Sequence, residues 1–385
     1  MRIYMDYQAS TPVDRRVFEA MQPFFSDKFG NPHSSEHAFG WDANEALEKA
    51  SQSIARQIGA EADEFFFTSG ATEANNIALL GFCEFNKKST RRKVLTTTIE
   101  HKSVLDVLYV AGKKFDLVLD TIAVDKQGFI DFDDLSSKVD DETLLVSVMH
   151  TNNEIGTIQN ISKISGICRK CGVIFHSDAT QGFLTSDIDV KTLGVDMLSF
   201  SGHKMYAPKG IGGLYIRREL QKKITPRFYG GGQQAGVRPG TAPVYLCCGL
   251  SKAVELMGGE EAEIERRRVR QYRDAFVDTL LREIKAVSVN GPTWEDRHPG
   301  NANICFEGID ASILLNAFQP EVAASSGSAC SSGQIHGSHV LAAMGLPSEK
   351  ISSSIRFSIG RFTTETDVLQ AASLIADSVR NVRCQ

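Results

Sequence analysis

The chain has 385 residues, of which 42% are hydrophobic and 23% are charged, and its formal net charge is -5. These values suit a globular protein with one large and one smaller domain. They argue against direct nucleic-acid binding, because no basic block or Lys/Arg-rich tail appears. No apolar run approaches the length of a membrane span, and no signal peptide opens the chain. We therefore expect a cytoplasmic protein without membrane contact.

The elements that we expect alternate between strands and helices. Strands are predicted at residues 65–67, 94–99, 117–124, 144–149, 173–175, 197–200 and 213–216. Helices are predicted at residues 41–58, 73–85, 103–111 and 161–171. This alternation is typical of an α/β fold with a mostly parallel sheet flanked by helices. We assign it to a large domain over residues 14–258.

A smaller α+β domain is predicted from residues 1–13 together with residues 259–385. It begins with a long charged helix near residue 260 and has short strands at residues 302–306 and 355–359. No internal repeat or low-complexity segment interrupts either domain.

The eight cysteines are expected to be reduced thiols, as in most large cytosolic chains. Cys168 and Cys171 have the spacing of a metal pair, but no second pair completes a zinc site, so we expect no metal. Cys330 differs from the others, because it lies among Ser, Gly and Ala in a segment of about residues 323–338. Such a segment buries little and should be exposed and mobile, as a thiol delivered to a substrate must be.

Polar residues follow two neighbouring strands of the predicted sheet. Asp178 comes after the strand at residues 173–175, and Lys204 comes after the strand at residues 197–200. Ligands of open α/β sheets lie just past such strand ends. An Asp and a Lys in these places are what a pyridoxal phosphate enzyme needs, since the amine holds the aldehyde and the carboxylate pairs with the ring nitrogen. The pair predicts carbanion chemistry on an amino acid.

A phosphate site is predicted at the turn of residues 68–75, which follows a strand and opens a helix. An ordinary capped turn explains this piece equally well, but Ser201 and His203 add donors close to Lys204. His101 ends another strand, where an imidazole could stack on the cofactor ring and move protons, or simply cap a helix.

Substrate recognition is assigned to an arginine and to amides. Arg356 lies on an alternating, half-buried strand and could bind a carboxylate with its fork, or form a surface salt bridge; Arg361 is the rival candidate. Asn153 and Gln181 could bond the cofactor or the substrate, or could belong to ordinary turns. The polar loop of residues 230–241 is too long for a simple turn and is expected to be functional or at an interface.

Together these motifs resemble cysteine desulfurases of the NifS/IscS type, class V aminotransferases among the fold-type I pyridoxal phosphate enzymes. The resemblance runs from residues 6–12 to residues 358–364. Its most specific pieces are Ser201-Gly202-His203-Lys204 and Ser325-Ser326-Gly327-Ser328-Ala329-Cys330. The resemblance implies conversion of L-cysteine to L-alanine with a persulfide on Cys330, by a homodimer that passes sulfur to an acceptor protein. Iron–sulfur cluster assembly or nucleic-acid thiolation would use that sulfur.

The resemblance also implies a role for each matching residue. Lys204 would bond the pyridoxal 5'-phosphate aldehyde, Cys330 would be the sulfur carrier, and His101 would stack on the ring and take part in proton transfer. The remaining cofactor contacts would come from Asp178 and Gln181 at the ring, from Ala71, Thr72, Ser201 and His203 at the phosphate, and from Thr241 at the partner subunit's phosphate. Asn153 and Arg356 would hold the substrate carboxylate.

Some departures from the family pattern leave alternatives open. The loop of residues 230–241 and the stretch of residues 331–339 differ from housekeeping iron–sulfur enzymes, whereas the Ala74-Asn75 pair is a mild change. Selenocysteine lyase activity and a specialised desulfurase for DNA sulfur modification are therefore alternatives. An aminotransferase or epimerase would not need Cys330, and a sulfur-relay scaffold without catalysis would not need the full set of site residues.

Overall fold

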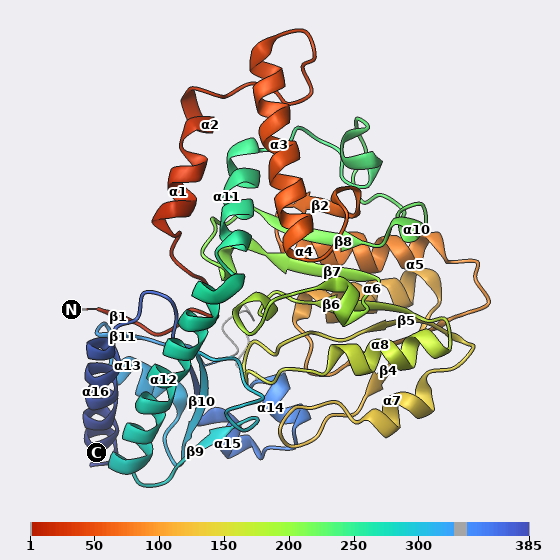
Figure 1. The fold of residues 1–385 in the computed structure, drawn as a ribbon. Coiled ribbons are helices and arrows are strands. Elements are labelled where there is room, and N and C mark those ends of the chain that lie inside the picture. Colours follow the sequence, from red (N-terminus) through yellow and green to blue (C-terminus); the bar gives the residue numbers. More distant parts are fainter. Residues whose placement is uncertain (1, 327–336, 385) are drawn as a thin grey trace.

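The computed structural model describes residues 2–326 and 337–384, which form a larger and a smaller lobe (Figure 1). The larger lobe is built on a seven-stranded sheet. From edge to edge its strands are β2 (Phe65–Thr68), β8 (Gly212–Ile216), β7 (Met197–Ser201), β6 (Ile174–Asp178), β5 (Thr143–Ser147), β3 (Lys93–Thr97) and β4 (Val118–Ile122). All neighbours from β7 to β4 are parallel, and only β8 runs antiparallel to its neighbours. The predicted mostly parallel sheet is confirmed.

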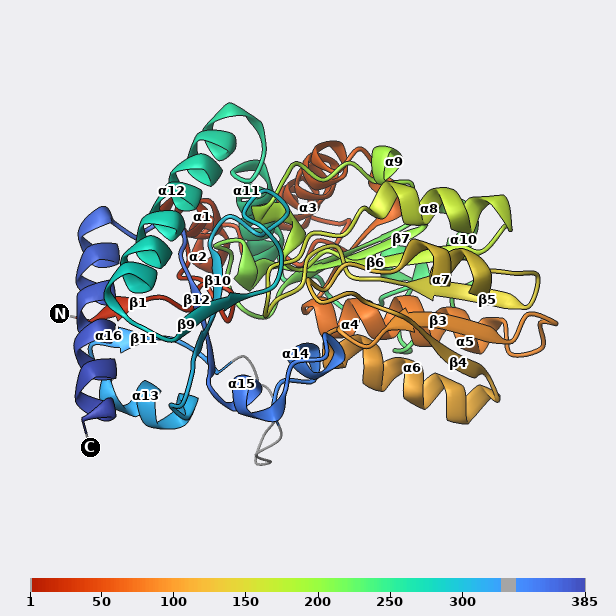
Figure 2. The ribbon, with the colours of Figure 1, turned by 90° about the horizontal axis from the view of Figure 1, so that it is seen from below.

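Helices cover both faces of this sheet (Figure 2). One face packs against α3 (Ala38–Gln57), α8 (Ile161–Lys170) and α11 (Val244–Glu255), and the other against α4 (Ala71–Asn75), α5 (Gly81–Phe85) and α6 (Lys102–Phe115). Alternate residues of one strand enter opposite cores: Phe65 and Phe67 lie in the first core and Phe66 lies in the second. Strands buried on both faces read as continuous apolar runs, which is why the sequence revealed them.

The other elements of the larger lobe are short. Its remaining helices are α1 (Arg15–Met21), α2 (Pro23–Ser26), α7 (Phe132–Lys138), α9 (Val190–Leu193) and α10 (Arg218–Gln221). Tighter or wider turns are η1 (Ala62–Glu64), η3 (Gly182–Leu184), η4 (Gly202–Lys204) and η5 (Gln233–Gly236), with a π-helical turn η2 (Asn76–Leu80) between α4 and α5.

The smaller lobe contains both ends of the chain (Figure 1). Its antiparallel sheet has the order β12 (Ser354–Ser358), β10 (Asn301–Phe306) and β9 (Val287–Asn290), and β1 (Ile3–Tyr4) pairs in parallel with β11 (Val322–Ala323). The helices of this part of the chain are α12 (Gly259–Glu283), α13 (Ala311–Ala317), α14 (His339–Ala343), α15 (Ser348–Ser352) and α16 (Glu365–Arg383). The expected long charged helix is α12, which carries the chain away from the large sheet.

Strand β12 differs from the half-buried strand that its alternation predicted. Ile355 and Phe357 enter the small core as expected, but Arg356 and Ser358 are buried as well. The reason is that the N-terminal segment covers the polar face of the strand. Gln8 donates its backbone N–H to Ser358 Oγ at 2.9 Å, and the backbones of Asp6 and Ser358 form an isolated parallel β-bridge. A covering segment 350 residues away leaves no mark on the local pattern.

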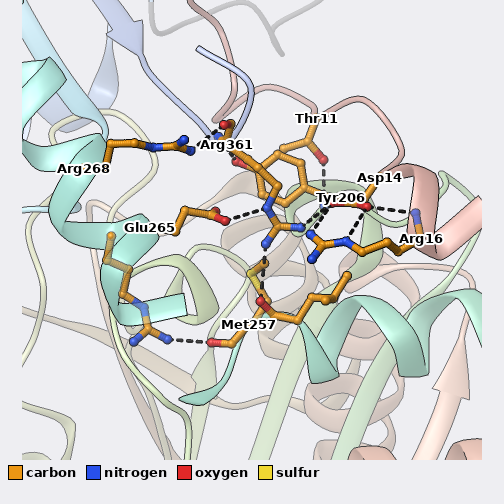
Figure 3. Close-up of polar contacts among 10 residues, drawn as sticks. Thr11, Asp14, Arg16, Tyr206, Met257, Glu265, Arg268 and Arg361 are labelled. Atoms are coloured by element: carbon orange, nitrogen blue, oxygen red, sulfur yellow. Dashed lines mark hydrogen bonds and ion pairs between the residues drawn. The ribbon is translucent and has the colours of Figure 1, made fainter. Parts of the chain in front are cut away.

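Arg361 links the two lobes (Figure 3). Its Nη1 lies 2.8 Å from Asp14 Oδ2, its Nε lies 2.7 Å from Glu265 Oε2, and its guanidinium stacks 4.2 Å above the Tyr206 ring. Hydrogen bonds from Arg16, opposed by burial, and then from Arg361 hold the pKa of Asp14 far below its ordinary value. The junction is therefore held by ionised groups with matched partners.

Over the described ranges, the search for a helix both long enough and apolar enough to span a bilayer found none.

Candidate active site

A cavity of about 870 Å³ opens past the carboxyl ends of the parallel strands. Parallel strands end at one edge of a sheet, which is where such folds bind ligands. Within the described residues, the cavity wall contains every predicted site residue except Thr241: Ala71, Thr72, His101, Asn153, Asp178, Gln181, Ser201, His203, Lys204 and Arg356. Cys330 lies outside the residues that the structure describes.

Asp178 is the last residue of β6 and is almost fully buried. Its Oδ2 accepts a hydrogen bond from Asn75 Nδ2 at 2.9 Å, and its Oδ1 accepts one from the backbone N–H of Thr180 at 2.9 Å. Each oxygen therefore has one donor among the described residues, and the carboxylate is held in one orientation at the cavity wall. Further lone pairs of the carboxylate stay available for a ligand N–H.

Lys204 ends η4, directly after the neighbouring strand β7. Its Nζ donates hydrogen bonds to the backbone oxygens of Gln8 at 2.6 Å and of Ala9 at 2.8 Å. The N-terminal segment thus forms one wall of the cavity, a role that sequence reasoning missed. No side-chain pattern could have revealed it, because backbone carbonyls make the contacts.

The predicted phosphate turn precedes α4. Gly70 has φ +152°, a conformation that favours glycine, and a Cβ there would lie 3.5 Å from Ser201 Oγ. Glu73 fixes the turn, since its carboxylate accepts from the Ser69 backbone N–H at 2.6 Å and from Arg238 Nε at 2.8 Å. Burial alone would raise the pKa of Glu73, but these hydrogen bonds outweigh it and hold the pKa below its ordinary value.

Positive charge gathers beside this turn. Lys204 and Lys209 both line the cavity, and Lys209 is a residue that sequence reasoning did not single out. Burial, with the two lysines adding to it, lowers the pKa of His203 to about 4. His203 is therefore neutral at physiological pH and can donate one hydrogen bond, while the lysines supply the charge that attracts an anion.

His101 caps the N-terminus of α6. Its Nδ1 accepts a hydrogen bond from the Ser103 backbone N–H at 3.1 Å. Burial lowers the pKa of His101, although the carboxylate of Asp178 opposes this effect. The helix cap that the sequence offered as one alternative is therefore present, and His101 also lies in the cavity wall.

Arg356 uses part of its guanidinium to bind protein atoms. Nη1 donates to the Asn153 backbone oxygen at 2.9 Å, and Nη2 donates to Asp6 Oδ1 at 2.8 Å. Nε is buried and has no hydrogen-bond partner within the described residues. The fork is thus held firmly at the cavity wall with donors to spare. Arg361, the rival candidate, belongs to the junction shown in Figure 3 and is absent from the lining of the cavity.

Both described ends of the Cys330 segment reach the cavity wall. On one side Ser325 pairs with Arg356 through backbone hydrogen bonds of 3.1 and 2.7 Å. On the other side His339 lines the cavity and donates from Nε2 to the Glu100 backbone oxygen at 3.0 Å, and Ser338 bonds to the Glu154 carboxylate.

Thr241 is exposed and lies in a loop that is anchored to the sheet edge. Gln234 makes the anchor, because its amide accepts from the Phe67 backbone N–H at 2.6 Å and donates to the Phe67 oxygen at 3.0 Å. This amide pairs with the open edge of β2 as another strand would. The loop is therefore ordered without Thr241 contributing to the cavity of its own chain.

The residues present fit pyridoxal phosphate. Several buried polar atoms of residues in the cavity wall have no partner within the described part of the chain, namely Gln8 Nε2, Thr180 Oγ1 and Gln181 Oε1. Buried polar groups are normally paired, so these atoms indicate that the cavity receives a polar ligand. A carboxylate for the ring nitrogen, an amine for the aldehyde and a cationic turn for the phosphate lie around one space.

Comparisons with known proteins agree with this geometry. The family model described as Aminotransferase class-V matches residues 3–370. A protein of Rickettsia bellii named cysteine desulfurase IscS is 46% identical over 99% of this chain and 92% of its own length.

Two solved structures show the same fold. One titled NifS-like protein has a TM-score of 0.91 and 34% identity over 99% of this chain and 100% of its own. One titled SspA in complex with cysteine has a TM-score of 0.82 and 32% identity over 94% of this chain and 100% of its own. The chain therefore belongs to the class-V aminotransferase family, and its cofactor is pyridoxal 5'-phosphate.

Proposed function

We propose that the protein is a cysteine desulfurase that converts L-cysteine to L-alanine and an enzyme-bound persulfide on Cys330. The observation that carries the proposal is a single cavity that brings Lys204 and Asp178 together with Arg356 and with both described ends of the Cys330 segment. The name of the Rickettsia bellii relative and the cysteine bound to SspA support this activity and substrate. In the proposal, residues 14–258 hold the cofactor, and residues 1–13 with 259–385 hold the thiol carrier.

The substrate carboxylate is bound by Arg356, with Asn153 beside it. The guanidinium is already oriented by the Asn153 carbonyl and Asp6, so little side-chain freedom is lost when the substrate binds. A charge-assisted fork of this kind fixes the direction of an amino acid and not only its position. The substrate amino group then faces the lysine side of the cavity.

Bound pyridoxal phosphate supplies an electron sink for negative charge on the substrate α-carbon. Asp178 would accept the ring N–H, Gln181 would bond the ring oxygen, and Ala71, Thr72, Ser201 and His203 would hold the phosphate. The Lys204 amine would hold the cofactor aldehyde and would take the proton from the substrate α-carbon. His101, neutral at physiological pH, returns a proton at a later step.

Sulfur transfer uses the Cys330 thiolate as a nucleophile. Its sulfur forms a bond to the substrate sulfur, the carbon–sulfur bond of the substrate breaks, and the electron pair of that bond stays with the carbon skeleton, which takes up a proton and leaves as alanine. The other cysteines are poor rivals, because burial raises the pKa of several of their thiols. These are Cys83 and Cys168 at about 12, Cys248 at about 11, and Cys247 and Cys305.

The active unit in this proposal is a homodimer. Thr241 lies outside the cavity of its own chain, so that its contact would be with the partner subunit's phosphate site. Large aromatic side chains with half or more of their surface exposed lie within residues 18–41 and in the loop that leads to Thr241. They support a second copy of the chain as the partner, since such side chains gather at interfaces. They are Phe18, Phe25, Phe29, Phe39, Trp41, Phe228 and Tyr229.

The persulfide is passed to an acceptor protein, for iron–sulfur cluster assembly or nucleic-acid thiolation. We propose a cytoplasmic location, because a thiol carrier and the free cysteines of this chain suit a reducing compartment. Selenocysteine is a second substrate to be tested, since the same cavity groups would bind it.

A paired assay tests the proposal. Wild type, Cys330→Ser and Cys384→Ser are incubated with L-cysteine and a thiol reductant, and alanine and sulfide are measured. Cys384 is the matched control, because it is an exposed cysteine directly after α16. Wild type and Cys384→Ser should make equal amounts of the two products, and Cys330→Ser should make neither while keeping the cofactor colour. Normal sulfide release by Cys330→Ser would disprove the persulfide assignment.

A further inference from the structure

Two polar side chains that the proposed mechanism does not use connect Asp178 with His101. Asn75, the last residue of α4, is fully buried, and its Nδ2 donates to Asp178 Oδ2 at 2.9 Å and to Ser103 Oγ at 3.0 Å. Ser103 Oγ lies 2.8 Å from Nδ1 of His101, in the first turn of α6. A continuous chain of hydrogen bonds therefore joins a carboxylate at the end of β6 to an imidazole at the start of α6.

Chemistry assigns the donor and the acceptor of each bond. A carboxylate only accepts, so the Asn75 atom that faces Asp178 is the amide nitrogen, which carries two hydrogens. The second hydrogen occupies one of the two lone pairs of Ser103 Oγ. The Ser103 backbone N–H donates to Nδ1 of His101 at 3.1 Å, so Nδ1 is an acceptor and the Ser103 hydroxyl hydrogen is directed to it as well. Both donors need the lone pair on Nδ1, which places the proton of the neutral imidazole on Nε2.

The surroundings of Asn75 argue that this amide is more than a packing residue. Among the described residues its Oδ1 has no hydrogen-bond partner, although the atom is buried. A buried amide with an unpaired oxygen is unfavourable, and an apolar side chain of similar size would avoid that penalty. Only the amide nitrogen of Asn75 is hydrogen-bonded, and its two bonds go to Asp178 and Ser103, which both line the cavity.

We propose that Asn75 and Ser103 are positioning residues that hold His101 in the tautomer protonated on Nε2 and tie its orientation to that of Asp178. The proposal rests on the proposed function, in which His101 stacks on the cofactor ring and Asp178 pairs with the ring nitrogen. With Nδ1 closed by two donors, the proton that His101 can deliver sits on the nitrogen farther from Ser103. The Asn75 amide thus orients both the proton donor, His101, and the carboxylate that pairs with the cofactor ring, Asp178.

Charged groups from several elements also act on His101. Asp178 from β6 and Asp106 from α6 favour the imidazolium, whereas Lys204 from η4 and His339 from α14 oppose it. Burial is the largest effect, and the pKa of His101 lies below its ordinary value. These charges stay in place when a neutral hydroxyl is removed, so a change at position 103 isolates the hydrogen bond.

The first test is a histidine-selective NMR titration of the holoenzyme, with the His101 signals assigned by their absence in His101→Gln. Nitrogen shifts of the wild type should report the tautomer protonated on Nε2. Ser103→Ala removes a donor to the neutral form and should raise the pKa of His101 by roughly half a unit to one unit. Ser162→Ala is the matched control, since Ser162 is likewise the second residue of its helix, α8, and is exposed. A wild-type tautomer protonated on Nδ1, or no shift in Ser103→Ala, overturns the proposal.

A double-mutant cycle tests the order of the residues. Asn75→Ala should also raise the pKa of His101, because the freed Ser103 hydroxyl can then accept from an imidazolium. The double variant should shift this pKa no further than Ser103→Ala alone, since Asn75 acts on the imidazole only through Ser103. Asn75→Ala should in addition move the cofactor absorbance, whereas Ser103→Ala should leave it nearly unchanged. Additive shifts of the pKa contradict the relay.

The outcome is separable from that of the proposed function. A protein that made no alanine but showed the tautomer and the non-additive shifts would keep the hydrogen-bonded relay and lose the desulfurase assignment. If the protein were an active desulfurase but the pKa of His101 stayed the same in Ser103→Ala and Asn75→Ala, the proposed function would stand and the hydrogen-bonded relay would be disproved. If Asn75→Ala fails to fold, the Ser103→Ala titration alone still decides the matter.

Discussion

The Arg356 guanidinium and the Asp6 carboxylate form a partly buried ion pair with 2.8 Å between Nη2 and Oδ1, across 350 residues of sequence. Asp6 therefore orients the side chain that we assign to the substrate carboxylate. Burial raises the pKa of Asp6 even though Arg356 opposes the effect, so protonation of Asp6 at low pH would break the ion pair.

Arg356→Gln should raise the KM for L-cysteine by roughly 10- to 100-fold with a smaller effect on kcat, because a charge-assisted hydrogen bond to the substrate is lost. Asp6→Asn keeps an acceptor for Nη2 and should raise KM less. Steady-state kinetics on cofactor-saturated enzyme measures both. An unchanged KM in Arg356→Gln would mean that Arg356 does not bind the substrate carboxylate.

Replacing Arg361 should lower the free energy of unfolding and leave the catalytic activity of the folded protein unchanged. Arg361→Met removes the cation that Asp14 and Glu265 share, although Asp14 keeps Arg16. The loss should therefore lie towards the lower end of the about 3–5 kcal/mol that breaking a buried pair costs. Arg15→Met is the control, since the Arg15 side chain is 91% exposed and its pair with Glu19 is worth under about 1 kcal/mol. Denaturant unfolding gives the two free energies. Equal losses in both variants would contradict the junction described above.

Glu100 predicts a pH dependence of stability. Burial raises the pKa of this carboxyl from 4.5 to about 8, although hydrogen bonds from Met149 and Thr97 oppose it. In that window the folded chain holds a proton that the unfolded chain has lost, so stability falls as pH rises towards 8. Glu100→Gln should flatten this fall.

The measurement for Glu100 is the midpoint of urea unfolding at several pH values between about 7 and 8, where histidines of the unfolded chain are mostly neutral. Glu283→Gln, an exposed change at the end of α12, should follow the wild type. Parallel curves for all three proteins would mean that Glu100 is ionised in the folded state.

The homodimer can be tested with hybrid subunits. Thr241→Ala should weaken cofactor retention, and Lys204→Ala should be inactive. In a hybrid of the two, the subunit with an intact Lys204 receives an intact Thr241 from its partner, so cofactor retention and activity should recover at that one site. Hybrids purified with two different tags provide the material. Recovery would fail if Thr241 served its own chain, and a monomer by light scattering would dismiss the dimer altogether.

The architecture followed from the sequence because burial on both faces leaves an unbroken apolar signal. All seven strands of the large sheet were predicted, within a few residues of their ends. The polar residues after these strands were assigned to one site because parallel strands end together, and the cavity unites them. Asp178 and Lys204 are the clearest instance, since neighbouring strands carry them.

What the sequence could not show depends on contacts between distant residues. The carbonyls of Gln8 and Ala9 reach Lys204 from nearly 200 positions away, and backbone atoms have no residue signature. Asn75 meets Asp178 across 103 positions, and the pattern around Asn75 indicated only a mild departure from the family. The burial of Arg356 was missed for the same reason.

The parallel pairing of β1 with β11 has a consequence for biosynthesis. Ile3 leaves the ribosome before its partner Val322, which is made more than 300 residues later, and Arg356 follows later still. The large sheet can form on the nascent chain, because its strands end at Ile216. The N-terminal segment that supplies the Gln8 and Ala9 carbonyls must wait unpaired. We expect the emerging chain to bring Lys204 and Asp178 together early, and to become able to bind its substrate only after Arg356 has emerged.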